Sequence, residues 1–279
     1  MPNLISQQDL VPLYVMIDEA VKELSLPKWG RPSILTDSEM MTILIYNTLL
    51  LHQKNLKDIL NFISNYHSQD FTHLPKYSTF VEHAHRLIPL MGNILSLTLA
   101  HSEINFADST MLEVCSLKRV EDHKVAKNAA SFGKNHQGWH FGFKLHAAIN
   151  MQKQFSAFCF SPANIYDAQM LPMLVKKYMK LLVGDSHYGA RVMARYIWEN
   201  FHLVIIAPPH YKQKNKLLTW WQNSLLSARS KIESVFDILK QHLHLVTSFP
   251  RSVDGYFLHY LRVLLAYQFS FLLNSFHSS

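Results

Sequence analysis

The hydrophobic positions in the first hundred residues follow the spacing of helices rather than strands. Residues 36–39 read Thr-Asp-Ser-Glu, the Thr-x-x-Glu pattern of a capping box, and the apolar residues after it predict a largely buried helix. A further helix is expected over residues 80–99, with Pro75 as the breaker before it and Ser78 as its N-cap. Residues 1–100 are therefore predicted to form a small all-helical domain.

From residue 104 the pattern changes to strands separated by helices. Residues 139–150 alternate between apolar and polar positions, which indicates a half-buried strand. The expected elements are strands at 104–109, 139–150, 155–160, 181–183 and 202–207, a solvated loop at 116–138, and helices at 167–179, 190–200, 225–243 and 256–273. This order predicts an α/β fold (α+β mixed sheet) of the ribonuclease H type, in which helices flank the sheet.

The composition indicates a globular protein with a polyanionic partner. The chain has 279 residues, 48% hydrophobic content and a formal net charge of +7, which suits a sizeable core and favours nucleic acid as the partner. Cys115 and Cys159 lie in apolar runs, so a disulfide framework is not expected. We expect a cytoplasmic protein with no membrane contact, because neither a signal peptide nor an apolar run of roughly 20 residues is evident.

Three acidic residues are the candidate chemical groups of the predicted sheet and its helices. Asp108 ends the first predicted strand, Asp185 follows the fourth, and Glu233 lies in the helix after the fifth. Because the first and fourth strands are neighbours in this type of sheet, the carboxylates are expected to converge. Hard divalent cations prefer oxygen ligands, and a pair of Mg²⁺ or Mn²⁺ ions about 4 Å apart would suit phosphoryl transfer on DNA.

Five motifs in order give the chain a likeness to a known family. They are Ala107-Asp108-Ser109-Thr110, Gly138-Trp139-His140-Phe141-Gly142-Phe143-Lys144-Leu145-His146, Ser161-Pro162-Ala163-Asn164 with Asp167, Gly184-Asp185-Ser186-His187-Tyr188-Gly189, and Arg229-Ser230-Lys231-Ile232-Glu233 with Phe236 and Lys240. With these motifs the chain resembles the DDE transposases of bacterial insertion sequences, which have a ribonuclease H-like core. The likeness is greatest to the insertion-sequence family numbered nine-eight-two.

The resemblance implies that Asp108, Asp185 and Glu233 are the catalytic and metal-binding residues. It also implies DNA-contacting or site-organising roles for Arg229 and Lys240. The further candidates for contact with DNA or support of the site are His187, Lys144, Asn164 and Asp167. Asn164 and Asp167 have the alternative of capping the helix that follows them.

Other residues suggest alternatives that stay open. His140, His146 and His187 could suggest a zinc site, but their spacing fits no helical ligand pair or Cys/His cluster. Trp220 and Trp221 lie beside Lys212, Lys214 and Lys216, so they could stack on a splayed base or pack in the core. The row of Arg229, Glu233 and Lys240 on one helix could equally be a surface row of salt bridges.

The predicted function is a transposase that binds the inverted-repeat ends of an insertion sequence and cuts and joins strands with two Mg²⁺ or Mn²⁺ ions. Its expected partners are double-stranded DNA, as transposon ends and as target, and a second copy of the chain in a homodimer or larger complex. Residues 1–100 are expected to serve DNA binding or dimerisation, and residues 101–279 to form the catalytic domain. The alternatives are a ribonuclease H-like nuclease without strand transfer and an inactive DNA-binding remnant.

Overall fold

The computed structural model describes residues 9–24, 33–135, 138–189, 191–209 and 217–276. Lys212, Lys214 and Lys216, which precede Trp220 and Trp221 in the sequence, lie outside these residues. The chain divides into two compact units, one made of residues 1–98 and 239–279 and the other of residues 99–238. The C-terminal residues therefore group with the N-terminal helices, whereas the sequence-based division assigns them to the catalytic domain.

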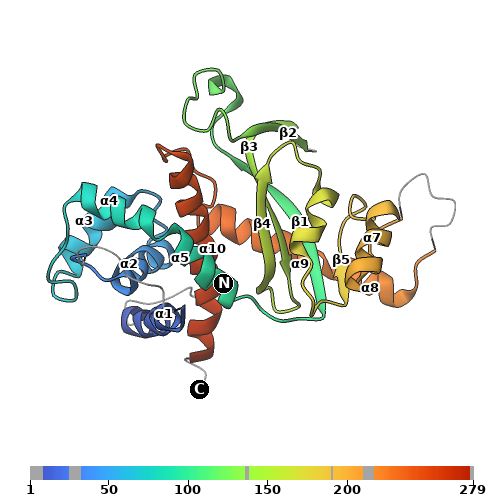
Figure 1. Cartoon of the computed structure of the whole chain (residues 1–279), viewed down its shortest axis with the longest axis horizontal. Coiled ribbons are helices and arrows are strands. Elements are labelled where there is room, and N and C mark those ends of the chain that lie inside the picture. The colour runs from blue at the N-terminus through green and yellow to red at the C-terminus, as the bar shows by residue number, and fades with distance from the viewer. Residues whose placement is uncertain (1–8, 25–32, 136–137, 190, 210–216, 277–279) are drawn as a thin grey trace. The chain divides into compact units, whose positions relative to one another are not determined.

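The regular secondary structure of the first unit, in the part that the structure describes, is helical. Its α-helices are α1 (Leu10–Leu24), α2 (Asp37–Leu50), α3 (Leu56–Tyr66), α4 (Tyr77–Arg86), α5 (Ile88–Leu97) and α10 (Val253–Phe276). Helix α2 packs against α1 and α10, and α10 also packs against α5 (Figure 1). The predicted capping box is confirmed, because the Glu39 amide donates to Thr36 Oγ1 and the Thr36 amide donates to the Glu39 carboxylate.

The single helix predicted over residues 80–99 is wrong in detail. The structure has two helices, α4 and α5, which meet at Leu87, and Pro89 lies in the first turn of α5. Proline has no amide hydrogen to donate, so it favours the first turn of a new helix over the interior of an old one. The N-cap of α4 is Lys76 and not Ser78, which lies inside the helix.

The second unit is built on a mixed sheet of six strands among the residues described. They are β1 (Ile104–Glu113), β2 (Ser131–Asn135), β3 (Gly138–Ile149), β4 (Phe155–Pro162), β5 (Leu181–Val183) and β6 (Val204–Ile206). Strands β2, β1 and β4 pair antiparallel with β3, while β1, β5 and β6 pair in parallel. The mixed sheet with flanking helices confirms the predicted ribonuclease H-like fold.

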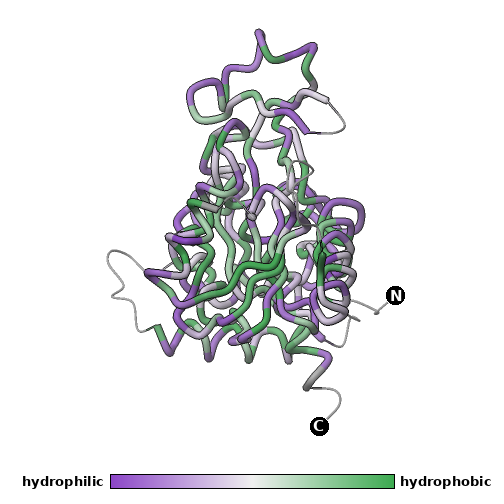
Figure 2. The backbone as a smooth tube through the Cα atoms, turned by 90° about the vertical axis from the view of Figure 1, so that its right-hand side faces the viewer, coloured by the Kyte–Doolittle hydropathy of each residue, from purple (hydrophilic) through white to green (hydrophobic). Residues whose placement is uncertain are grey.

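Helices pack against the sheet of the second unit. They are the short α6 (Leu171–Leu174) against β4, α7 (Arg191–Phe201) against β6 and α9 (Ser230–Asp237) against β1, while α8 (Trp220–Ala228) packs against α9 (Figure 1). A core cluster joins Ala107, Ala148 and Leu182 of the strands to Leu171 and Leu174 of α6. The connection between β1 and β2 projects at the top of Figure 2, where much of it is hydrophilic.

Strand β3 is buried on both faces over most of its length, so the prediction of a half-buried strand is wrong. All residues from Phe141 to Ile149 are buried, including Lys144 and His146 at expected polar positions. The reason is the central position of β3, which has neighbours on both sides and α6 packed against it. Gly142 suits this crowding, because a Cβ there would overlap the backbone oxygen of Leu112 on β1.

Several element boundaries differ from the predictions. Strand β1 continues to Glu113, and β2 lies inside the segment that was expected to be a loop. The helix expected over 167–179 is reduced to a 3-10 turn, Asp167–Met170, followed by the four-residue α6. The helix expected over 225–243 is instead a succession of α8, α9 and a π-helical turn, Ile238–His242.

Candidate active site

Strand register aligns Asp108 of β1 with Asp185, which lies in the turn after β5. Phe106 of β1 pairs with Val183 of β5 in parallel, and each aspartate lies two residues beyond its member of this pair. Because side chains alternate along a strand, Asp108 points to the same face as Phe106. Asp108 lies in the middle of β1, and not at the end of a strand as expected, because antiparallel pairing with β3 extends β1 beyond β5.

Arg229 connects Asp108 to Glu233. Its Nη1 donates to Asp108 Oδ2 at 2.9 Å, and its Nη2 donates to Glu233 Oε1 at 2.6 Å. The side chains of Asp108 and Arg229 are 19% and 24% exposed, whereas that of Glu233 is 53% exposed. Arg229 and Glu233 of the predicted row thus form an ion pair at i,i+4, and Arg229 also pairs with Asp108 of β1. Two carboxylates from distant parts of the sequence therefore face one cation.

The pKa of Asp108 is raised to about 6, chiefly by burial and to a smaller extent by the nearby carboxylates of Asp185 and Asp167. The Ser109 amide, which donates to Asp108 Oδ1, and the charge of Arg229 act in the opposite direction. Desolvation disfavours the charged form of a carboxyl group, and the partial compensation by Arg229 is insufficient. A cation bound beside Asp108 would favour the charged form of this carboxyl group and lower its pKa.

The raised pKa of Asp108 predicts that metal-free protein loses stability as pH rises. The folded-state pKa of about 6 exceeds the unfolded value, so the folded chain holds the extra proton between about pH 4 and pH 6. The stabilisation from this proton is complete below about pH 4 and is lost as pH rises through 6, by an amount on the order of 3 kcal/mol. Denaturant unfolding of the wild type and D108N in EDTA at several pH values measures this change in the free energy of unfolding.

The wild type should lose stability relative to D108N between about pH 4 and pH 7, because the asparagine amide does not titrate in this range. Asp122, an exposed carboxylate in the β1–β2 connection, provides the control substitution D122N, which should keep the pH dependence of the wild type. A constant difference between the wild type and D108N across this range would contradict the expected protonation of Asp108.

Lys144, Asp167 and His146 form a second polar group, on the opposite face of the sheet. Asp108 pairs with Ala147 across β1 and β3, so the adjacent His146, and Lys144 two residues before it, point away from the Asp108 side. Lys144 Nζ donates to Asp167 Oδ1 and to the Ile165 carbonyl, both at 2.9 Å. Burial lowers the pKa of His146 to about 4, and its Nε2 lies 2.8 Å from Ser161 Oγ.

The segment after β5 holds Asp185 and His187 in a compact turn. The His187 amide donates to Asp185 Oδ1 at 2.9 Å, and His187 Nδ1 lies 3.0 Å from the Tyr166 hydroxyl. Tyr188 is fully buried below this turn, and burial raises its pKa well above the usual value. A Cβ at Gly184 would lie 2.8 Å from the Tyr188 ring, so only glycine lets the ring pack against this backbone.

Asn164, Asp167 and Lys240 are the remaining candidates. Asn164 is exposed. Asp167 begins its 3-10 turn, but its carboxylate accepts from Lys144, and the turn has no side-chain cap. Lys240 belongs to the other compact unit, in the π-helical turn, where the 100° spacing of an α-helix that placed it in the row of Arg229 no longer applies.

The zinc alternative finds no support in the positions of the histidines. His140 contacts the Glu113 carboxylate and the Asn135 side chain, His146 is buried against Ser161, and His187 is exposed. Within the residues described, no group of three or more His, Cys, Asp or Glu side chains is arranged to hold a metal ion.

The carboxylates nevertheless fit a hard divalent cation in kind. Asp108 and Glu233 already accept hydrogen bonds from one guanidinium, which stands in for a cation between them. Asp185 is near enough for its charge to raise the pKa of Asp108. Oxygen donors of this type are the ligands that Mg²⁺ and Mn²⁺ prefer.

From the sequence, no role was predicted for Tyr166 or Tyr188, nor was the ion pair between Arg229 and Asp108 predicted. Tyr166 and His187 both lie in loops, and no periodic pattern predicts the contact between their side chains. The i,i+4 spacing of Arg229 and Glu233 does predict their pair, but the step from Arg229 to Asp108 spans 121 positions of sequence.

The fold is that of a ribonuclease H-like domain, in which Asp108 lies on β1 and Asp185 follows the neighbouring parallel strand β5. Residues 99–253, more than half of the chain, match the family described as the transposase DDE domain, and the chain belongs to this family. The protein is thus a transposase by family. Comparison with curated proteins finds no match. Among the helices described, none is both long enough and apolar enough to cross a membrane.

Proposed function

We propose that the chain cuts the ends of an insertion sequence and joins them to target DNA at a site formed by Asp108, Asp185 and Glu233. The observation that carries the proposal is the convergence of Asp108 and Glu233 on one guanidinium, with Asp185 two residues beyond the end of the neighbouring strand β5. Membership of the transposase DDE domain family supports the same reaction class. The inverted-repeat ends and the likeness to the family numbered nine-eight-two belong to the proposal.

The three carboxylates would hold two Mg²⁺ or Mn²⁺ ions, which would activate the attacking water or 3′-hydroxyl and stabilise the leaving oxygen. Glu233 is exposed on α9 and would complete the site as Arg229 moves from it. Arg229, once released, could contact a DNA phosphate, since a planar guanidinium suits phosphate oxygens. His187 would contribute at the exposed rim, where Tyr166 orients its ring. Lys144 and Asp167 would support the opposite face, and Asn164 and Lys240 would contact DNA directly.

Strand transfer is tested with DNA that mimics pre-cleaved transposon ends. With Mg²⁺ or Mn²⁺ present, the wild type should join the 3′-hydroxyl of a labelled end to a target plasmid. Cleavage without joining would support the rival ribonuclease H-like nuclease, and neither reaction would support an inactive remnant. Because two ends must be joined, the active complex is proposed to be a dimer or larger, which sedimentation with DNA ends would measure.

Arg229 is predicted to compete with divalent metal in the absence of DNA. Its guanidinium holds an oxygen of both Asp108 and Glu233, so R229Q should strengthen Mn²⁺ binding, by roughly threefold to tenfold. Isothermal titration with Mn²⁺ measures the affinity. The control is R195Q, because Arg195 pairs with Glu199 on the exposed face of α7. Weaker Mn²⁺ binding by R229Q would show that Arg229 supports the ligands instead of competing for them.

A further inference from the structure

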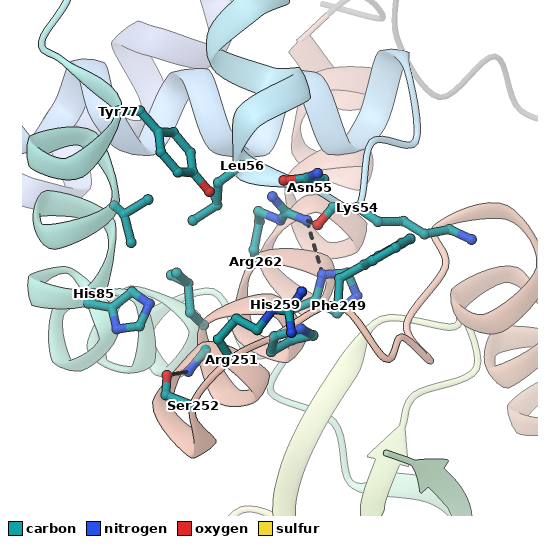
Figure 3. Close-up of a pocket in the computed structure, with 14 residues that line it drawn as sticks. Lys54, Asn55, Leu56, Tyr77, His85, Phe249, Arg251, Ser252, His259 and Arg262 are labelled. Carbon is teal, nitrogen blue, oxygen red and sulfur yellow. Dashed lines mark hydrogen bonds between the residues drawn. The ribbon is translucent and has the colours of Figure 1, made fainter. Parts of the chain in front are cut away.

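A basic cavity in the helical unit has no role in the reaction described above. It has a volume of about 220 Å³, many times the space that one water molecule requires. Its charged lining residues are Lys54, Arg251 and Arg262, and neither Asp nor Glu lines it among the residues described. In Figure 3, Arg262 of α10 and Arg251 of the segment before it lie near the centre, while the Lys54 side chain, from the segment before α3, extends to the right. An excess of positive charge in a concave site favours an anionic ligand.

Arg262 is the buried anchor of this cavity. It is 1% exposed, and its Nη2 donates to the carbonyls of Gln53 and Lys54 and contacts His259 Nδ1. Its Nε and Nη1 have no hydrogen-bond partner among the residues described. No carboxylate pairs with it in that part of the chain, and burial lowers the pKa of the neighbouring His259 to about 3, so His259 is neutral. A buried guanidinium without a counter-charge is costly unless an anion accompanies it.

The backbone adds a second attraction for an anion. Helices α3 and α10 both begin at the cavity, where Asn55 is the N-cap of α3 and Ser252 Oγ accepts from the Gly255 amide in the first turn of α10. Helix N-termini carry partial positive charge and present amide hydrogens. Tyr77 and Phe249 line the cavity and are 46% and 57% exposed, so an apolar wall stands beside the cationic groups.

We propose that this cavity binds a phosphate group, as inorganic phosphate or as a phosphodiester of DNA. Arg262 would supply the buried charge, Lys54 and Arg251 would reach the ligand from the rim, and the aromatic wall would contact the sugar or base beside a DNA phosphate. The DNA source rests on the proposed function, whereas the inorganic phosphate source does not. The site would give the helical unit a fixed point of contact with a DNA backbone.

The test compares two double variants of the full chain. K54Q/R251Q removes two rim charges, while K57Q/R86Q removes a Lys and an Arg from exposed positions in the same unit that do not line the cavity. The substitutions are placed at the rim of the cavity because substitution of the buried Arg262 can unfold the helical unit. Titration with inorganic phosphate at constant ionic strength and anisotropy of a labelled DNA duplex are the two measurements.

For at least one of the two probes, inorganic phosphate or the duplex, the affinity of K54Q/R251Q should be lower than that of K57Q/R86Q by about tenfold or more. A loss in the phosphate measurement alone assigns the site to a small phosphate anion. A loss of affinity in the duplex measurement assigns the site to DNA. In that case the slope of log affinity against log salt concentration should also decrease, by about the amount expected for one phosphate contact. Equal affinities of the two double variants for both probes would overturn the proposal. None of these outcomes depends on cleavage, so the proposed reaction is tested separately.

Discussion

Replacing any one of the three carboxylates by its amide should abolish metal-dependent cleavage of transposon-end DNA. D108N, D185N and E233Q each keep the shape of the side chain but remove a charged oxygen ligand, and each should lower the cleavage rate by about 10³-fold or more. The reason is that Asp108 and Glu233 converge on one cation and Asp185 lies two residues beyond the end of the adjacent strand β5. Single-turnover cleavage with Mg²⁺ and with Mn²⁺ measures the rates.

Matched controls separate loss of a ligand from loss of the fold. Asp237 is an exposed carboxylate on the same helix as Glu233, and Asp122 is exposed in the β1–β2 connection. D237N and D122N should cleave DNA at the rate of the wild type, and circular dichroism should show all five variants folded. Cleavage within about tenfold of the wild type by D108N, D185N and E233Q would exclude the proposed site, whatever the controls do.

The elements that could be predicted from the sequence are those that depend on local spacing. The capping box at Thr36 and Glu39 is one example, because its two hydrogen bonds join residues three positions apart. The mixed sheet is another, since apolar runs such as Leu181–Val183 mark buried strands and their order restricts the topology. The ribonuclease H-like fold could therefore be predicted from short-range patterns and from the order of the elements along the chain.

Elements fixed by distant contacts were not predictable in this way. Strand β2 carries a single large apolar residue, Phe132, and owes its conformation to pairing with β3. Helix α10 packs against the N-terminal helices although most of the chain separates them in sequence. Hydrophobic periodicity predicts a helix but not which distant helix it contacts. The π-helical turn Ile238–His242 changes the angular spacing beyond α9 for a reason that the sequence pattern does not contain.

The acidic site illustrates both cases. Parallel neighbouring strands explain why Asp108 and Asp185 could be singled out together from the sequence. The contact of Arg229 with Asp108 depends on how α9 packs against β1, and the packing was not accessible from either segment alone. The same holds for Asp167, whose partner Lys144 is known only from the structure.

Breaking the buried ion pair of Lys144 and Asp167 should have the largest effect on stability. Lys144 Nζ donates to Asp167 and to the Ile165 carbonyl, and the two charged side chains are 11% and 18% exposed. K144M removes the cation but leaves the carboxylate and the carbonyl in place, so the free energy of unfolding should fall by about 3–5 kcal/mol. Trp139, Trp198, Trp220 and Trp221 all belong to this unit, so tryptophan fluorescence during urea unfolding reports mainly on it.

The control K118M changes an exposed lysine of the β1–β2 connection and should alter the free energy of unfolding by less than about 0.5 kcal/mol. If the cost of K144M comes from an unpaired charge, the double variant K144M/D167N should be more stable than the sum of the two single losses predicts, because it leaves no buried ion. Additive losses would instead assign the effect to packing of the lysine stem. Because the charge of Asp167 also raises the pKa of Asp108, an Asp167 without Lys144 would make protonation at the acidic site still more favourable.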